Sequence, residues 1–130
     1  MPHPDSTLRY WLGQRSAVIV DRPMGSRHPE FPELAYPVNY GYIPNTEAGD
    51  MEPLDAYVLG VEVPISSFIG EVIAIVVRHD DTEDKLAVAP TGLRPPRGEI
   101  ERATRFQERF FAREIIMHAP DPDTRTPDRP

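Results

Sequence analysis

Short apolar runs separated by turn residues fill the first two thirds of the chain and predict β-strands. Their β-branched and aromatic residues are typical of strands, and Gly, Pro and Asp break the sequence between them. The runs cover residues 17–20, 36–42, 55–59, 70–78 and 85–89. The segment 24–33 is predicted to be a loop, because Gly25, Pro29 and Pro32 exclude regular structure. Several short strands with tight connections favour a barrel or a sandwich.

Helical spacing is found at both ends of this pattern. Late in the chain, a stripe at intervals of three and four residues predicts a helix with one apolar face. The stripe consists of Ile100, Ala103, Phe106 and Phe110. A shorter helix is predicted near the N-terminus, beginning after Ser6 or Thr7 and ending at Gly13. Residues 119–130 contain no large apolar side chain, so we expect a disordered tail after a single domain spanning 1–118.

Composition narrows the class of protein. The chain has 130 residues, enough for one modest core, and contains no cysteine, which excludes disulfides and thiolate metal sites. No apolar run is long enough to cross a bilayer and no signal peptide opens the sequence, so we expect a cytoplasmic protein without a membrane partner. The formal net charge of −7 argues against a nucleic-acid partner, whose phosphates need Lys and Arg.

Two acidic clusters, at 50–55 and 80–85, are the candidate chemistry. In an extended segment the side chains of Asp50 and Glu52 point to the same side, so both carboxylates can reach one cation. Mg²⁺ takes oxygen ligands and often keeps water and substrate phosphate in its shell. Carboxylates brought together by the fold repel one another unless a cation compensates. The clusters therefore predict metal-assisted phosphoryl chemistry, with two solvated acidic turns as the alternative.

Three segments carry a family resemblance. They are the tyrosine-rich 36–43 (YPVNYGYI), the acidic 49–55 (GDMEPLD) and 83–90 (EDKLAVAP). Together they resemble the soluble inorganic pyrophosphatases of the Mg²⁺-dependent, β-barrel family, over a region from about Val18 to Phe111. The resemblance implies a mainly β (α+β) fold, an OB-like five-stranded β-barrel with one or two flanking helices. It also implies a homo-oligomer, as is common for this family in bacteria.

The resemblance implies a set of metal ligands. Asp50 and Asp55 match two aspartates of the family motif and are expected to bind Mg²⁺. Asp84 matches the second of two later metal-ligating aspartates. The first of that pair is Asp80 or Asp81, and the sequence leaves this choice open.

Catalytic and phosphate-binding roles are implied in the same way. Glu52 stands where the family has an aspartate near the nucleophilic water, so it is expected to act as general base or to orient that water. Asp21 takes the place of an acidic site residue. Tyr40 and Lys85 match residues that contact phosphate, and Tyr40 is expected to serve in catalysis as well. Lys85 directly follows Asp84, whereas the usual spacing leaves one residue between them.

The cationic side of the site departs from the family. Pro29 falls where a substrate-binding lysine normally stands, and a hairpin with a phosphate-binding arginine is missing before Tyr36. Arg27 is expected to bind phosphate in its place, with Arg22 or His28 as alternatives.

The expected activity is that of an inorganic diphosphatase. A metal-activated water would hydrolyse inorganic diphosphate, a small-molecule substrate, to two phosphates. Two alternatives remain from the residues. The missing cations favour a hydrolase of an organic or nucleotide diphosphate. Glu52 in place of an aspartate, together with the lost cations, favours a catalytically inactive OB-like binding module.

Overall fold

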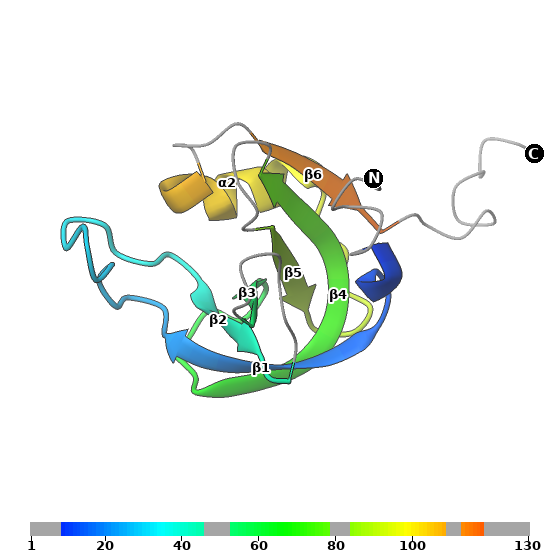
Figure 1. Cartoon of the computed structure of the whole chain (residues 1–130), viewed down its shortest axis with the longest axis horizontal. Helices are drawn as coiled ribbons and strands as arrows, with labels where there is room; N and C mark the ends of the chain where they lie inside the picture. The colour runs from blue at the N-terminus through cyan, green and yellow to red at the C-terminus, as the bar shows by residue number, and fades with distance from the viewer. Residues whose placement is uncertain (1–8, 46–52, 79–83, 109–112, 119–130) are drawn as a thin grey trace, which may run out of the picture.

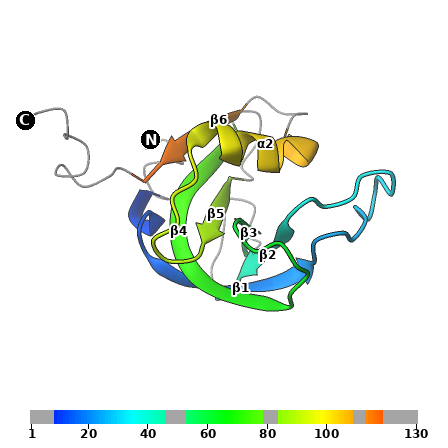
Figure 2. The same ribbon diagram turned by 180° about the vertical axis from the view of Figure 1, so that it is seen from behind.

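The computed structural model describes residues 9–45, 53–78, 84–108 and 113–118 (Figures 1 and 2). These segments form one short 3₁₀ turn, six strands and one α-helix. In chain order they are η1 (Arg9–Trp11), β1 (Arg15–Arg22), β2 (Asn39–Ile43), β3 (Leu54–Val58), β4 (Ser67–Arg78), β5 (Lys85–Ala89), α2 (Arg97–Glu108) and β6 (Arg113–Met117).

Five of the strands close into a barrel. The strand order is β1-β2-β3-β5-β4, and an additional pairing of β1 with β4 completes the ring. Only β3 and β5 run parallel; the other pairs are antiparallel. The long β4 curves through the molecule in Figure 1, pairing with β1 over its first residues and with β6 over its last. This confirms the OB-like five-stranded barrel with a flanking helix, to which β6 is added.

The barrel interior is aliphatic, because alternate residues of each strand point inward. In β1 this alternation is unbroken from Ser16 to Val20, with Val18 and Val20 buried and the residues between them exposed. The interior cluster consists of Val18, Val20, Ile43, Leu54, Ala56, Val58, Val72, Ile75, Val77, Leu86, Val88 and Ile116. Burial of these side chains supplies the main free energy that holds the barrel closed.

A second buried layer lies on the outer face of the barrel, and α2 contributes Ile100 and Phe106 to it. It contains three tyrosines, at positions 36, 40 and 57, beside small and branched residues of β4 and β5. Polar residues occur in this layer as well: Lys85 is buried among the same strands. The candidate site develops here and not in the barrel interior.

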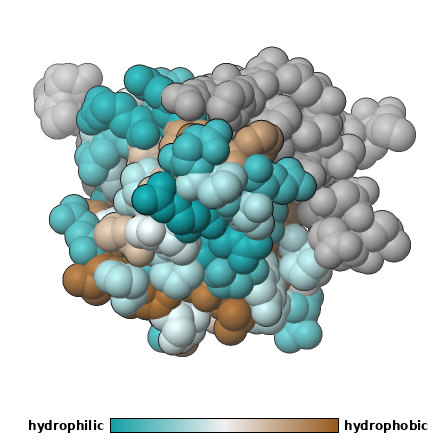
Figure 3. Space-filling model, turned by 90° about the vertical axis from the view of Figure 1, so that its left-hand side faces the viewer, coloured by the Kyte–Doolittle hydropathy of each residue, from teal (hydrophilic) through white to brown (hydrophobic). Residues whose placement is uncertain are grey.

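The connection between β1 and β2, residues 23–38, projects from the barrel on the left of Figure 1 and the right of Figure 2. An isolated bridge between Arg27 and Ala35 holds its two arms together. Figure 3 views the molecule from that side. Hydrophilic side chains occupy the centre of the view and apolar ones gather along its lower border, so this face offers polar groups to solvent.

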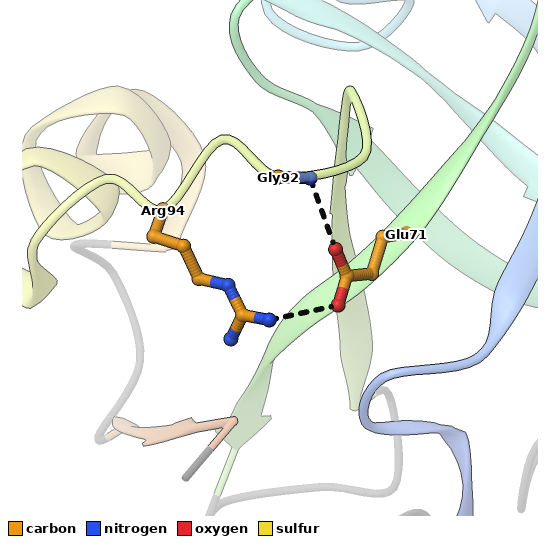
Figure 4. A network of polar contacts seen from close by, with 3 residues as sticks. All are labelled: Glu71, Gly92 and Arg94. Atoms are coloured by element: carbon orange, nitrogen blue, oxygen red, sulfur yellow. Dashed lines mark hydrogen bonds and ion pairs between the residues drawn. The ribbon is translucent and has the colours of Figure 1, made fainter. Parts of the chain in front are cut away.

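Glu71 on β4 ties down the connection that leads from β5 into α2 (Figure 4). Its Oε1 accepts a hydrogen bond from the Gly92 N–H at 3.3 Å, and its Oε2 lies 3.1 Å from an Arg94 guanidinium nitrogen. Gly92 has a φ of +90°, a conformation that favours glycine. The network therefore fixes the entry to α2.

The strand predictions are largely confirmed. β5 has the predicted bounds, and β4 begins at Ser67, before the predicted start at residue 70. β2 begins only at Asn39, because Pro37 has no N–H to donate to a ladder. β6 was missed, since its five residues lack a clear alternation.

The helical predictions have mixed outcomes. The late helix is confirmed as α2, although Phe110 lies outside the described residues. The described part of the predicted N-terminal helix is the 3₁₀ turn η1, after which Gly13 adopts a φ of +83°. The predicted tail, 119–130, also lies outside the described residues. In the part of the chain that the structure describes, no helix has the length and apolar character needed to cross a membrane.

Candidate functional site

Two parallel strands bring Asp55 and Lys85, which belong to the two predicted acidic segments, to one end of the sheet. β3 and β5 are neighbours, with Asp55 opposite Lys85 in register. Each strand directly follows one of the acidic clusters in sequence. Because parallel strands start at the same edge, the residues at which both clusters join the sheet lie side by side. The tertiary structure thus places together what the sequence separates by about thirty residues.

Lys85 is the buried cation at this point. Its side chain is 2% exposed, whereas the side chain of Asp55 is 38% exposed. The Lys85 Nζ lies 3.2 Å from the Asp55 Oδ2 and 5.5 Å from the centre of the Tyr40 ring. A buried ammonium is costly unless it is paired, so the carboxylate and the ring face hold it in place. The same carboxylate still reaches solvent, where it can meet a ligand.

An aromatic row supports this pair. The Tyr40 ring lies 4.9 Å from that of Tyr57 and 5.5 Å from that of Tyr36, measured between ring centres. Phe106 of α2 meets Tyr36 edge-on at 5.0 Å. Such contacts are individually worth about 1 kcal/mol beyond area burial. They fix the ring beside which the Lys85 ammonium is held.

Charged groups of β1 and β3 influence the pKa of Tyr36. Burial raises the pKa of Tyr36 above its usual range. The Arg22 guanidinium opposes this shift by its charge and a hydrogen bond, while the carboxylates of Asp21 and Asp55 add to it. The hydroxyl therefore stays neutral at pH 7. Asp21, predicted from sequence as an acidic site residue, acts on the same hydroxyl as Asp55.

Two predicted phosphate contacts are engaged elsewhere. The Arg27 Nη1 donates to the Pro32 carbonyl at 3.1 Å on the exposed loop. The His28 Nδ1 accepts from the backbone N–H groups of Glu30 and Phe31 at 3.1 and 3.2 Å. Both side chains thus brace the 23–38 connection. A phosphate-binding role for Arg27 stays a prediction.

The predicted metal ligands are only partly described. Asp55 is accessible and Asp84 is 5% exposed, directly before Lys85. The remaining ligands, Asp50, Asp80 and Asp81, lie outside the described residues, as does the predicted base Glu52. Within residues 9–45, 53–78, 84–108 and 113–118, no three His, Cys, Asp or Glu side chains lie close enough together to hold a metal ion. The carboxylate of Asp55 is nevertheless the type of ligand that hard divalent cations take.

Sequence reasoning missed the pairing of Arg22 with Tyr40. The register of β1 against β2 shifts between Val20 and Arg22, so that Arg22 pairs with Tyr40. If the side chains of β1 alternated strictly, that of Arg22 would point into the barrel, on the same side as Val20. No residue pattern marks this irregularity, apart from Pro23, which ends the strand.

The sequence of this chain is similar to those of known proteins of one family. The family model for inorganic pyrophosphatase matches residues 13–117. An inorganic pyrophosphatase of Campylobacter jejuni is 34% identical over 91 residues, which are 65% of this chain and 49% of that protein. One from Rickettsia bellii is 29% identical over 96 residues, 70% of this chain and 51% of that protein. The chain therefore spans about half the length of the curated relatives it matches.

Solved structures share the fold. An inorganic pyrophosphatase from Ehrlichia chaffeensis superposes with a TM-score of 0.64 and 19% identity, covering 82% of this chain and 88% of the other. One from Neisseria gonorrhoeae gives a TM-score of 0.58 and 22% identity, covering 72% of each chain. At these identities the likeness concerns the fold alone.

Proposed function

Since the chain belongs to the inorganic pyrophosphatase family, we propose that it hydrolyses inorganic diphosphate to two phosphates. The observation that carries the proposal is the pairing of a buried Lys85 ammonium with a partly exposed Asp55 carboxylate. Both side chains stand where two parallel strands begin, each directly after an acidic segment. A fixed cation beside carboxylates suits a substrate that carries phosphate charge and arrives with a metal ion.

The family uses a divalent metal ion, and we propose Mg²⁺ for this chain. Asp50, Asp55, Asp84 and one of Asp80 or Asp81 would hold it. When bound, the ion would neutralise phosphate charge and lower the pKa of the attacking water. Of these carboxylates, that of Asp55 is accessible in the structure, which supports its role.

The remaining residues have separate tasks in this proposal. Water attacks one phosphorus, the bond between that phosphorus and the bridging oxygen breaks, and the second phosphate leaves with the bridging oxygen. Glu52 takes the proton of the water or orients it, and Asp21 supports it as a second acidic group. Lys85 stabilises negative charge on a phosphate, and Tyr40 fixes Lys85 and contacts the same phosphate. A buried, preoriented ammonium suits this task because it needs no reorganisation during the reaction.

The wider setting is also proposed by analogy with the family. The partner is the small-molecule substrate, with no nucleic acid and no membrane, and the chain assembles as a homo-oligomer in the cytoplasm. The acidic composition supports the exclusion of nucleic acid.

Phosphate release from inorganic diphosphate tests the function. We expect release by the purified protein with Mg²⁺ and loss of release when the metal is chelated. Asp55→Asn should lower turnover by about 100-fold or more, since it removes a ligand charge next to the reacting phosphate. Glu62→Gln, a change at an exposed carboxylate in the connection between β3 and β4, is the control and should keep the wild-type rate. An Asp55→Asn variant with unchanged turnover would refute the assignment.

A hydrolase of an organic diphosphate is the second candidate. It is favoured by the hydrogen bond from Arg27 to the Pro32 carbonyl, because this bond holds the Arg27 guanidinium on the loop and not at the phosphate-binding site. Release of phosphate from a nucleoside diphosphate, with inert inorganic diphosphate, would select this candidate. Binding of either diphosphate without any turnover would select the inactive binding module.

A further inference from the structure

The β1–β2 bulge places an arginine next to the proposed site. Tyr42 pairs with Ile19 and Gly41 with Val20, but Tyr40 pairs with Arg22. Asp21 is therefore the extra residue of a bulge, and it opposes Tyr40 together with Arg22. Bulges of this kind re-aim a side chain. Arg22 is turned from the inward side, where Val18 and Val20 point, to the outer face that carries Tyr40.

The guanidinium of Arg22 is held on this face by a contact with its own strand. One of its nitrogens donates to the Asp21 carbonyl at 3.1 Å. Arg22 also counters the rise in the pKa of Tyr36 that burial causes, which agrees with a guanidinium near the Tyr36 hydroxyl. A guanidinium carries five N–H donors, so the contact with Asp21 leaves donors for a ligand. Its side chain is half-buried, which leaves it access to a ligand.

Tyr40 lies between the strand positions of Arg22 and Lys85 and connects the two residues. Tyr36 packs on Tyr40 at 5.5 Å, and the Tyr40 ring lies 5.5 Å from the Lys85 Nζ. Tyr40 is also the residue opposite Arg22 in the sheet. Tyr40 therefore has Arg22 as its strand partner on β1 and the Lys85 ammonium of β5 near its ring.

We propose that Arg22 is a phosphate-binding residue of this chain and that it supplies the cation for which sequence reasoning selected Arg27. The inference rests on the proposed function and deepens it. The planar guanidinium can bind two oxygens of one phosphate, whereas the Lys85 ammonium acts as a point charge on the other phosphate or the bridge. A substrate with two linked phosphates fits two cations that both neighbour Tyr40.

Two measurements on the full chain test this assignment. The first is calorimetric binding of methylenediphosphonate, a diphosphate analogue that water cannot cleave, in the presence of Mg²⁺. The second is phosphate release from inorganic diphosphate. We expect Arg22→Gln to raise the Kd of the analogue about tenfold or more and to lower kcat/KM by about 100-fold. Arg22→Lys should show a smaller loss of analogue binding and of kcat/KM. Lysine keeps the positive charge but lacks the planar group that can bind two phosphate oxygens at once.

Control variants separate binding from a structural role. Arg15→Gln changes an exposed arginine at the other end of the same strand and should leave both readouts unchanged. Tyr36→Phe removes the hydroxyl whose pKa Arg22 influences. If Arg22 served only to hold Tyr36, Tyr36→Phe and Arg22→Gln would reduce analogue binding equally; the proposal expects a clearly smaller effect of Tyr36→Phe.

The possible results are distinguishable. Unchanged Kd and turnover in Arg22→Gln, or a larger loss in Arg27→Gln, would overturn the assignment. A wild-type protein that binds the analogue without hydrolysing diphosphate, and loses binding in Arg22→Gln, would refute the proposed activity but support Arg22. A wild-type protein that does neither overturns both. If Arg22→Gln does not fold, Arg22→Lys decides: an unchanged Kd would contradict the proposal.

Discussion

The Lys85 Nζ lies 3.2 Å from the Asp55 Oδ2, yet the two side chains differ sharply in exposure, at 2% and 38%. The lysine is fixed inside the outer layer, and the aspartate connects it to solvent. The pair joins the first residue of β5 to the second residue of β3. It therefore combines a structural contact between neighbouring strands with the charge that the proposed reaction needs.

Lys85→Met tests this double role. Met keeps an unbranched side chain of similar length and removes a buried charge, so the free energy of unfolding should change by no more than about 2 kcal/mol. Asp55→Asn leaves the buried ammonium without its charged partner and should destabilise the fold by about 1–2 kcal/mol more than Lys85→Met. Urea denaturation gives both values. The reverse order of stability would contradict the view that Asp55 compensates Lys85.

Phosphate release by Lys85→Met should fall by about 100-fold or more even though the fold is retained, because one cationic contact to phosphate is lost. Full activity in a folded Lys85→Met variant would show that the ammonium has only a structural role.

The raised pKa of Tyr36 predicts a loss of stability at high pH. In the unfolded chain a tyrosine ionises near pH 10, whereas burial keeps Tyr36 protonated in the folded state. Its contribution is therefore complete below about pH 10 and is lost as the pH rises through the folded-state pKa. Urea midpoints at pH 8 and at about pH 10.5 should show a smaller drop for Tyr36→Phe than for the wild type. Tyr10→Phe, at an exposed tyrosine, should keep the wild-type drop.

Asn39 joins two connections and is fully buried. Its Oδ1 accepts from the Met24 and Ile65 N–H groups at 2.8 and 3.2 Å, and its Nδ2 donates to the Val63 carbonyl at 2.9 Å and to the Val61 carbonyl at 3.4 Å. Asn39→Ala should cost about 2–4 kcal/mol, because several buried backbone groups lose their partner. Thermal unfolding measures this cost. Asn39 therefore braces both connections.

Asn39→Asp is the matched change for that prediction. It keeps the acceptor oxygen and loses both donated hydrogen bonds, so it should also lower the free energy of unfolding substantially. An Asn39→Ala variant within 0.5 kcal/mol of the wild type, about the range of an ordinary surface substitution, would contradict the bracing role.

Gly41 allows β1 and β2 to approach closely. A Cβ at this position would lie 1.8 Å from the Ile19 carbonyl oxygen, which belongs to the backbone and cannot rotate away. Gly41→Ala should therefore destabilise the barrel by about 3 kcal/mol or more. Gly98→Ala is the control, because its Cβ would meet only the end of the Arg102 side chain at 3.7 Å. The control should leave thermal stability unchanged or raise it by about 0.5 kcal/mol. Equal midpoints for the two variants would contradict the close approach.

The site was predictable from sequence to the extent that its residues carry local signatures. Asp55, Tyr40 and Lys85 were selected from short motifs, and the structure brings these three together through the ion pair and the ring contact. Arg22 was named from the sequence as an alternative to Arg27, but no local signature favoured it. Its placement depends on a bulge, which is decided by how β1 closes against β2 and β4 and not by the residues of β1 alone.

The sequence by itself determined the class of fold, the strands β4 and β5, the helix α2 and the family resemblance of three segments. Local alternation, turn residues and apolar spacing are properties of neighbouring residues, so they can be read from the chain. Only the tertiary structure decided that β3 and β5 run side by side in parallel, that Lys85 is buried against Asp55, and that Arg22 pairs with Tyr40. These relations join residues far apart in sequence, and they follow from the closure of the barrel, which no local pattern encodes.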